Sequence, residues 1–335
     1  MAYEDIDNTL PRWRGFNLTF LFSQRSSGKL NEDHLRWIAD WGFDFVRLPM
    51  SYRRWADPET PDQNDQSVLA EIDRAVELGR ELGVHVNLNL HRAPGYCVND
   101  HQQEPYDLWK DPEGTEAFCS QWRMFAQRYH GIPSEQLSFD LVNEPPGPGH
   151  RGFLVRDYQR VVRTASAAIR QVDPDRLIVA DGISWGRQPV PELADLRVAQ
   201  SCRGYEPFGI SHYQASWVDG EKFPQPTWPG AESFDGNRWG RAELEAHYDP
   251  WVELIRLGSG VHCGEMGCYN RTPHDVALAW LGDLLEVLGE RNIGWGLWNL
   301  DGSFGILNSG REDVEYEDFH GEKLDRKMLE LLQAH

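Results

Sequence analysis

Two glutamates each end a short apolar run of this 335-residue chain. Leu137-Ser-Phe-Asp-Leu-Val-Asn-Glu144 leads into Pro145, which stops a strand because proline has no N–H for the ladder and fixes its own φ. Gly260-Val-His-Cys-Gly-Glu265 ends in the same way. Hydrolysis of a glycosidic bond needs one carboxyl as acid/base and a second on the opposite side of the sugar. The pair predicts this chemistry, whereas either glutamate alone is as well explained as a solvated strand end.

Other polar and aromatic side chains stand at the ends of further strand-like runs. They are Arg47, His91, Asn143, the adjacent pair His212 and Tyr213, and Trp298. Because the carboxyl ends of parallel strands converge on one mouth of a barrel, we expect these side chains around the two glutamates. In Trp295-Gly-Leu-Trp298, alternation puts the two indoles on opposite faces of the strand. Trp298, nearer the strand end, is the candidate for the site.

Strand-like and helix-like stretches alternate along the whole chain. The predicted strands are Gly15–Leu18, Phe43–Pro49, Val84–His91, Leu137–Glu144, Leu177–Asp181, Gly209–Tyr213, Gly260–Glu265 and Gly294–Asn299. The predicted helices are Asn31–Trp41, Ser67–Leu82, Thr115–Tyr129, Phe153–Val172, Arg241–Leu257, Pro273–Leu288 and Glu322–Leu332. Ser67 and Thr115 are expected as N-caps, and Gly83 as the residue that ends its helix.

Eight strands that alternate with helices predict an α/β fold, a (β/α)₈ TIM barrel that forms a single domain over residues 1–335. The alternative is an open doubly wound sheet. Such a sheet would have a glycine-rich phosphate turn after its first strand, and the sequence has none there. The stretch 214–239 is rich in Pro, Gly, Trp and Asp, and we expect it to be an inserted loop over the site.

Composition excludes several classes of partner. The net charge of −20 argues against nucleic acid and anionic membranes, which need a basic surface, and is compatible with a neutral substrate. Residues 1–7 have neither the basic region nor the apolar core of a signal peptide, and no run of 18 apolar residues occurs. We therefore expect no membrane span and a cytoplasmic protein, or a secreted one if a signal peptide has been removed. The five cysteines lack a disulfide framework and are expected to be reduced and mostly buried. CxxC pairs and HExxH are missing, so no metal or cofactor is expected.

Taken in chain order, Arg47, His91, Asn143-Glu144, His212-Tyr213, Glu265 and Trp298 resemble the conserved set of glycoside hydrolase family 5, the cellulase family, within clan A. The resemblance spans Arg14 to Asn299. It implies a retaining β-glycosidase that acts on β-linked gluco- or manno-type oligo- or polysaccharides. Glu144 would be the acid/base with a raised pKa, and Glu265 would be the nucleophile, kept ionised by Arg47 beside it. The two glutamate carboxyls would be about 5 Å apart.

The resemblance also implies the roles of the remaining residues. Asn143 would form a hydrogen bond with the 2-hydroxyl of the reacting sugar, His91 would bind other hydroxyls, and Trp298 would form the floor on which the sugar ring stacks. The family spaces its sixth-strand pair as His-x-Tyr, whereas His212 and Tyr213 are adjacent and would point to opposite faces of a strand. A bulge could redirect one of them, or Ser211 or Gln214 could replace one.

The substrate and the mode of attack remain open in the sequence. His91-Arg-Ala-Pro-Gly95 is similar to the HxAPG stretch of the family's exo-acting β-1,3-glucanase branch. Together with Trp217, Trp228 and Trp239 in the inserted loop, it favours a pocket for short oligosaccharides over an endo-acting cleft for long chains.

Two other protein classes are less consistent with the sequence. A catalytically inert carbohydrate-binding barrel would keep the aromatic residues and lose one of the glutamates. A metal-dependent barrel hydrolase would have a motif such as HxH after the first strand, where this sequence has Gly15-Phe-Asn-Leu18.

Overall fold

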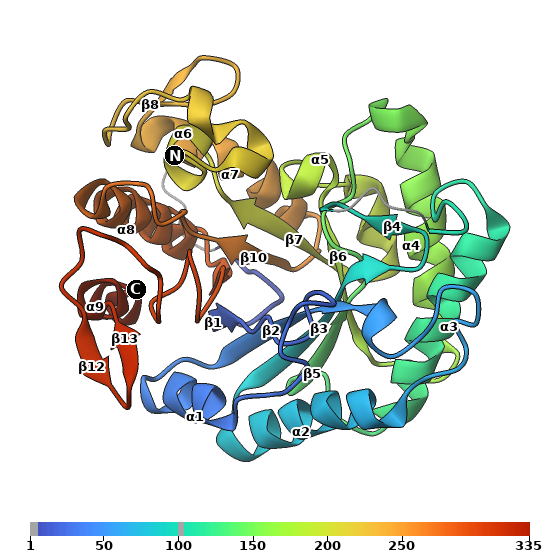
Figure 1. Ribbon diagram of the computed structural model, residues 1–335. Helices are drawn as coiled ribbons and strands as arrows, with labels where there is room; N and C mark the ends of the chain where they lie inside the picture. Colours follow the sequence, from blue (N-terminus) through green and yellow to red (C-terminus); the bar gives the residue numbers. More distant parts are fainter. Residues whose placement is uncertain (1–5, 100–103) are drawn as a thin grey trace.

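The computed structural model describes residues 6–99 and 104–335, and its central feature is a closed barrel of eight parallel strands (Figure 1). The strands follow one another around the ring in chain order, and the pairing of β2 with both β1 and β3 closes it. The barrel strands are β1 (Arg14–Asn17), β2 (Phe45–Ser51), β3 (His85–Ala93), β5 (Leu137–Asp140), β6 (Leu177–Asp181), β7 (Ala199–Gly204), β10 (Val261–Met266) and β11 (Gly294–Leu297). The predicted TIM barrel is confirmed.

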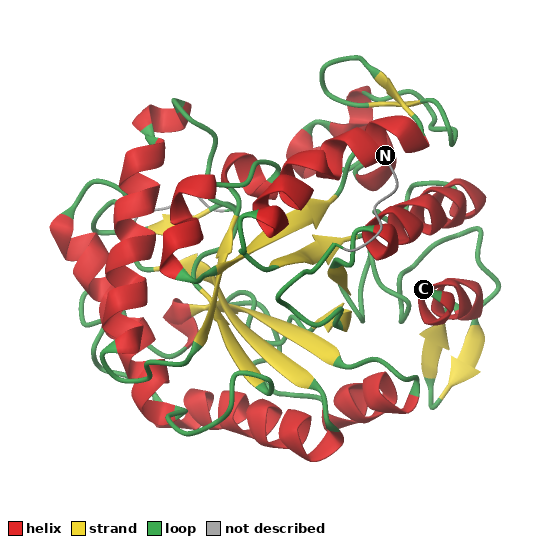
Figure 2. Cartoon of the chain, turned by 180° about the vertical axis from the view of Figure 1, so that it is seen from behind, coloured by secondary structure: helices red, strands yellow, loops and turns green. Residues whose placement is uncertain are grey.

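Helices surround the barrel, as Figure 2 shows from behind. They are α1 (Glu32–Asp40), α2 (Gln66–Leu82), α3 (Pro112–Arg128), α4 (Val155–Arg170), α5 (Ile183–Gly186), α6 (Phe208–Ser211), α7 (Arg241–Arg256), α8 (His274–Glu290) and α9 (Arg326–Ala334). Short 3₁₀ turns are η1 (Tyr52–Arg54), η2 (His150–Gly152), η3 (Pro191–Leu196), η4 (Ser216–Val218) and η5 (Gly220–Lys222). Gly83 ends α2 in the left-handed conformation as predicted, whereas the N-caps of α2 and α3 are Asp65 and Asp111.

Strand β3 explains how the barrel positions polar groups. All nine of its residues are buried, yet apolar and polar side chains alternate along it. Val86, Leu88 and Leu90 belong to the hydrophobic core, whereas Asn87 and Asn89 hydrogen-bond to the neighbouring strand β5. Because successive side chains point to opposite faces of a strand, one face packs on the helices and the other carries polar groups into the barrel.

The sixth barrel strand is β7, so the prediction of a strand at Gly209–Tyr213 is wrong. Phe208–Ser211 form the single helical turn α6 instead. The true strand reads Ala-Gln-Ser-Cys-Arg-Gly and lacks the apolar run by which the other strands were found. Its burial is balanced by hydrogen bonds, because the Gln200 side chain donates to the carbonyl of Val190 and accepts from its N–H, both at 2.8 Å.

Short additional elements follow the barrel strands β3, β7 and β11. The two-residue strand β4 (Tyr96–Cys97) pairs antiparallel with the end of β3. The inserted stretch 214–239 contains η4, η5 and the small hairpin of β8 (Ala231–Glu232) and β9 (Arg238–Trp239), which stands at the top of Figure 1. The hairpin of β12 (Glu317–Phe319) and β13 (Glu322–Leu324) precedes α9.

The cysteine side chains at all five positions are buried, as expected. Among the described residues, no helix has both the length and the apolar character that crossing a membrane requires.

Candidate active site

A cavity of about 920 Å³ lies where the barrel strands end. Of the predicted residues, five line it: Glu144, Glu265, His91, His212 and Trp298. Arg47 and Asn143 are completely buried and contact the lining residues from below. Tyr213 is not among the described residues that line the cavity.

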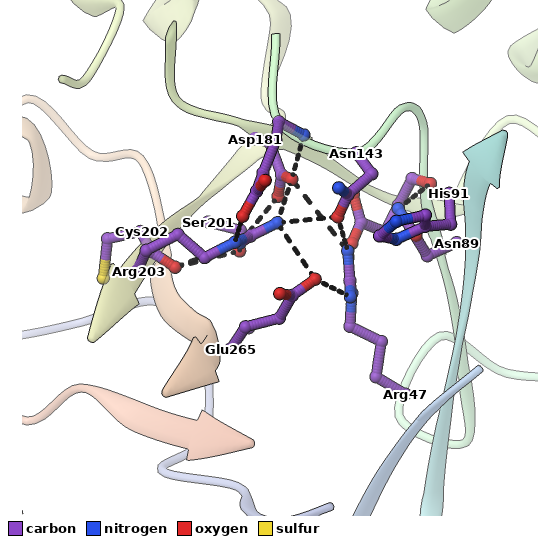
Figure 3. Close-up of polar contacts among 12 residues, drawn as sticks. Arg47, Asn89, His91, Asn143, Asp181, Ser201, Cys202, Arg203 and Glu265 are labelled. Atoms are coloured by element: carbon purple, nitrogen blue, oxygen red, sulfur yellow. Dashed lines mark hydrogen bonds and ion pairs between the residues drawn. The ribbon is translucent and has the colours of Figure 1, made fainter. Parts of the chain in front are cut away.

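Glu265 lies near the end of β10 among three donors. Arg47 Nη1 donates to its Oε1 at 2.6 Å, the Tyr205 hydroxyl donates to its Oε2 at 3.0 Å, and Arg203 Nη2 lies 3.5 Å from Oε1. Figure 3 shows this carboxylate between the two guanidinium groups. Burial by itself raises the pKa of Glu265, but the charges of Arg203 and Arg47 outweigh it and bring the pKa below its ordinary value. This carboxyl is therefore ionised at neutral pH.

Glu144 follows β5 in a left-handed backbone conformation with φ of 49°, which is costly for a residue with a side chain. Two contacts hold this backbone: its N–H donates to Asp181 Oδ2 at 2.8 Å, and its carbonyl accepts from the Tyr96 hydroxyl at 2.6 Å. Its carboxylate accepts from Arg203 Nε at 2.9 Å. Burial and the nearby charge of Glu265 raise the pKa of Glu144 to about 7, although Arg203 opposes the shift.

The two glutamates thus have opposite protonation tendencies inside one cavity, and the guanidinium of Arg203 contacts both. A carboxyl that keeps its proton near neutral pH can serve as a general acid, and a carboxylate held ionised can serve as a nucleophile or stabilise positive charge. When two carboxyls have pKa values shifted in opposite directions, one can act as the acid while the other acts as the base or nucleophile.

Arg47 and Asn143 lie directly beneath the cavity and connect the two glutamates through hydrogen bonds. Arg47 reaches from β2 and donates to Asp140 Oδ2 at 2.8 Å and to Asn143 Oδ1 at 2.9 Å. Asn143 Oδ1 also accepts from Arg203 Nη2 at 3.0 Å (Figure 3). Two donors on the oxygen fix the amide orientation, and the buried Nδ2 has no partner among the described residues. The amide N–H₂ therefore donates to no group in the described part of the chain.

His91 and Trp298 form one wall of the cavity. Their rings lie 5.8 Å apart in a stacked arrangement, and Phe22 contacts both. Burial, together with the charges of Arg47 and Arg203, brings the pKa of His91 well below its ordinary value, so its ring is neutral. Trp295, the alternative to Trp298, is only 1% exposed and belongs to the core, as the alternation along the strand predicted.

His212 reaches the cavity from the turn after α6 rather than from a strand. Its ring stacks on Phe208 with centroids 4.4 Å apart, and burial and the charge of Arg187 lower its pKa to about 3. Tyr213 is half-buried, and its hydroxyl accepts from the Gln214 side chain. His212 and Tyr213 therefore do not lie at the end of the sixth barrel strand, where the sequence predicted them.

Sequence analysis missed two residues of the site, Arg203 and Tyr205. Both follow from the true sixth strand, since Arg203 is near the end of β7 and Tyr205 comes directly after it. Arg203-Gly204-Tyr205 has the spacing of the family's His-x-Tyr pair, with arginine in place of histidine. The spacing was a usable signal, but it was hidden because the strand before it is polar.

The inserted stretch 214–239 contributes fewer tryptophans to the cavity than predicted. Trp217 lines the cavity, whereas Trp228 and Trp239 are not among its described lining residues. The indole N–H of Trp228 donates to Asp283 on α8, and Trp239 packs on His247 of α7. Val218 and Phe234 are the other lining residues from this stretch.

Comparison with known proteins gives three consistent results. The family described as Cellulase (glycosyl hydrolase family 5) matches residues 4–303. Endoglucanase C of Acetivibrio thermocellus is 26% identical over 314 residues, covering 86% of this chain and 89% of that protein, and cellodextrinase A of Ruminococcus flavefaciens is 25% identical over 303 residues, covering 84% and 83%. A crystal structure described as a glycoside hydrolase superposes with a TM-score of 0.92 at 41% identity, covering 96% of this chain and 99% of that one.

Proposed function

Because the chain belongs to glycosyl hydrolase family 5 and is a glycosidase that hydrolyses O-glycosyl bonds, we propose that it cleaves β-linked gluco- or manno-type oligosaccharides with retention of configuration. Glu144 is the acid/base of this proposal and Glu265 is the nucleophile. The observation that carries it is the opposite pKa shift of two carboxyls that line the same cavity.

The reaction proceeds in two displacements. Glu265 attacks the anomeric carbon while Glu144 protonates the leaving oxygen, which gives a covalent glycosyl-enzyme. Glu144, now ionised, then takes a proton from water, and the water attacks the same carbon and releases Glu265. Charge stabilisation of Glu265 by Arg47 and Tyr205 supports its role as nucleophile and leaving group.

The proposed binding roles are supported by side chains that line the cavity or lie directly beneath it. Asn143 Nδ2 is buried and unpaired within the described chain, which supports a hydrogen bond to the 2-hydroxyl of the reacting sugar. Trp298, Trp185 and Trp217 offer aromatic faces in the cavity for the apolar faces of sugar rings. His91, kept neutral, can donate to or accept from a hydroxyl.

Initial rates on a panel of aryl β-glycosides and β-linked oligosaccharides test this function, with Glu265→Ala as the blank. Turnover of one glycoside that disappears in the variant supports the proposal and identifies the sugar. Equal activity of the variant would overturn it, and ligand binding without turnover would support an inert sugar-binding barrel instead.

For the substrate length we propose short oligosaccharides attacked from a chain end. Trp217, exposed by 57%, extends the cavity rim from the inserted stretch, and the name of the relative cellodextrinase A is consistent with a short substrate. Endo-attack on long chains is the second candidate, and two neighbouring cavities favour it. One of about 320 Å³ shares Thr19 and Ser26 with the main cavity, and one of about 410 Å³ shares Val98, His150 and Trp185.

The product profile on a long soluble β-glucan or β-mannan distinguishes the two candidates. End-wise attack releases one small product while viscosity falls slowly. A rapid fall in viscosity with products of mixed length would overturn the end-wise proposal and support the endo-acting candidate.

A further inference from the structure

Arg203 is the cation closest to Glu144, and it replaces the histidine that the family's sixth-strand pair provides. We propose that Arg203, anchored by Asp181, is the positioning residue that orients the Glu144 carboxyl and sets the pH at which it loses its proton. This inference rests on the proposed acid/base role of Glu144 and goes beyond it, because it concerns a residue that touches the carboxyl rather than the substrate.

The two glutamates depend on Arg203 to different degrees. Arg203 Nε donates to Glu144 Oε1 at 2.9 Å, and no other cation pairs with Glu144 in the described part of the chain. Glu265 is 3.5 Å from Arg203 but has Arg47 at 2.6 Å and the Tyr205 hydroxyl as well. Loss of Arg203 would therefore leave Glu144 without an ion-pair partner in the described part of the chain. Glu265 would keep Arg47 and Tyr205, although the charge of Arg203 also lowers its pKa.

The guanidinium itself is held from several sides. Asp181 accepts from both Nη1 and Nη2, and Nη1 also donates to Ser201 Oγ at 2.9 Å and to the Cys202 carbonyl at 3.1 Å (Figure 3). The side chain is 2% exposed, and a Cβ added at Gly186 would lie 2.5 Å from its Cγ. Tight packing and a nearly complete set of acceptors leave the guanidinium little freedom, so that it can fix the direction of the Glu144 carboxyl.

Arginine suits this position for a chemical reason. A guanidinium stays protonated at any pH at which the protein is folded, whereas an imidazole can itself take up a proton. The proton of Glu144 therefore has no competing acceptor in Arg203. When Glu144 has given its proton to the leaving oxygen, Arg203 Nε–H stabilises the resulting carboxylate until water returns a proton.

Several titratable groups face Glu144, and their charges determine how its protonation depends on pH. They are Glu265 of β10, Arg203 of β7, Asp181 of β6, Tyr96 of β4 and Tyr205 after β7. Glu265 and Asp181 favour the protonated form of Glu144, and Arg203 favours the ionised form. Burial raises the pKa of both tyrosines well above 10, so they stay neutral over the range in which Glu144 titrates.

The test compares the pH dependence of kcat/KM in two variants of opposite sign, on a β-glycoside with a poor leaving group. Arg203→Met removes a positive charge, and we expect the alkaline limb to move to higher pH by about one unit or more. Asp181→Asn removes a negative charge, and we expect that limb to move to lower pH. A structural role would lower the rate without moving the limb in opposite directions, and this result would overturn the proposal.

Further variants keep the test decisive if Arg203→Met folds poorly. Arg203→Lys retains the charge, and we expect its alkaline limb within about 0.5 unit of wild type at a reduced kcat. In Arg203→Lys, dinitrophenyl glycosides should lose less rate than alkyl glycosides, because they need little acid assistance. Equal losses on both substrates would contradict a role through Glu144. Arg163→Met, which removes an exposed pair with Asp195 on the barrel exterior, is the matched control and should change neither limb.

Failure of this proposal differs from failure of the proposed function. If Glu265→Ala abolishes turnover but the Arg203 and Asp181 variants keep the alkaline limb of wild type, the glycosidase mechanism is supported and the positioning role of Arg203 is wrong. If Glu265→Ala is fully active, the catalytic assignment itself falls.

Discussion

At the scale of single residues, the upper barrel holds two guanidiniums, Arg47 and Arg203, and four carboxyls. The two cations do not balance four carboxylates, three of which are buried while the Glu144 side chain is 16% exposed, and this imbalance favours carboxyls that keep their protons near neutral pH. Burial and, to a smaller extent, the charge of Asp181 raise the pKa of Asp140 to about 7. Burial and the charge of Glu265 raise the pKa of Glu144 to about 7 as well. Glu265, with both arginines as neighbours, is the one whose pKa is lowered.

This imbalance predicts a bell-shaped dependence of kcat/KM on pH. The alkaline limb should lie near pH 7, where Glu144 loses its proton, and the acid limb below the ordinary carboxyl range, where Glu265 gains one. Glu144→Gln should remove the alkaline limb and reduce kcat/KM about 10²- to 10⁴-fold for alkyl glycosides. Initial rates between pH 4 and 9 measure the alkaline limb, and an unchanged alkaline limb in the variant would assign it to another group.

The same pKa predicts a stability effect. The folded protein holds the Glu144 proton up to about pH 7 and the unfolded chain only up to about pH 4.5, so wild type loses stability as the pH rises through this window. Glu144→Gln avoids this loss and should be more stable than wild type by up to about 3 kcal/mol at pH 8, with no gain near pH 4. Urea unfolding at both pH values measures the difference, and the exposed Glu221→Gln is the control. An equal effect at both values would rule out relief of a buried charge.

At the scale of elements, the barrel could be predicted where strands carry apolar runs. Seven of the eight predicted strands overlap a barrel strand, and they bring Glu144, Glu265, His91 and Trp298 to one cavity. β7 could not be found in this way, because its long buried side chains, Gln200 and Arg203, are satisfied by hydrogen bonds, and only the small Ala199 and Cys202 pack in apolar clusters. The residues that this strand positions, Arg203 and Tyr205, were missed for the same reason.

Close approach of β1 and β2 predicts an intolerant glycine. A Cβ added at Gly15 would lie 1.7 Å from the carbonyl oxygen of Phe45, which belongs to the paired strand and cannot move without breaking the ladder. Gly15→Ala should therefore lower the free energy of unfolding by about 3 kcal/mol or more. Gly282 in α8 has only the tip of Leu331 at 3.8 Å, so Gly282→Ala should instead raise stability by up to about 1 kcal/mol. Denaturant unfolding measures both, and similar effects of the two would contradict this packing.

At the scale of the whole molecule, a net charge of −20 surrounds a cavity that contains carboxylates. Neutral glycosides should feel this field little, so their kcat/KM should change less than about twofold between 0.05 and 0.5 M salt. A glucuronide of the same aryl leaving group should be turned over more slowly at low salt and gain from added salt. A strong salt dependence with the neutral substrate would indicate that charge, and not shape and hydrogen bonding, governs its binding.

If Glu265 is the nucleophile, it forms a covalent glycosyl-enzyme, and trapping that intermediate tests the assignment directly. Incubation with an activated 2-deoxy-2-fluoro-β-glycoside of the hydrolysed sugar slows the second displacement and should add the mass of one fluoroglycosyl group to each protein molecule. Peptide mapping by mass spectrometry should locate that group on Glu265. An adduct on another residue, or hydrolysis of the natural substrate with inversion of the anomeric configuration, would contradict the account.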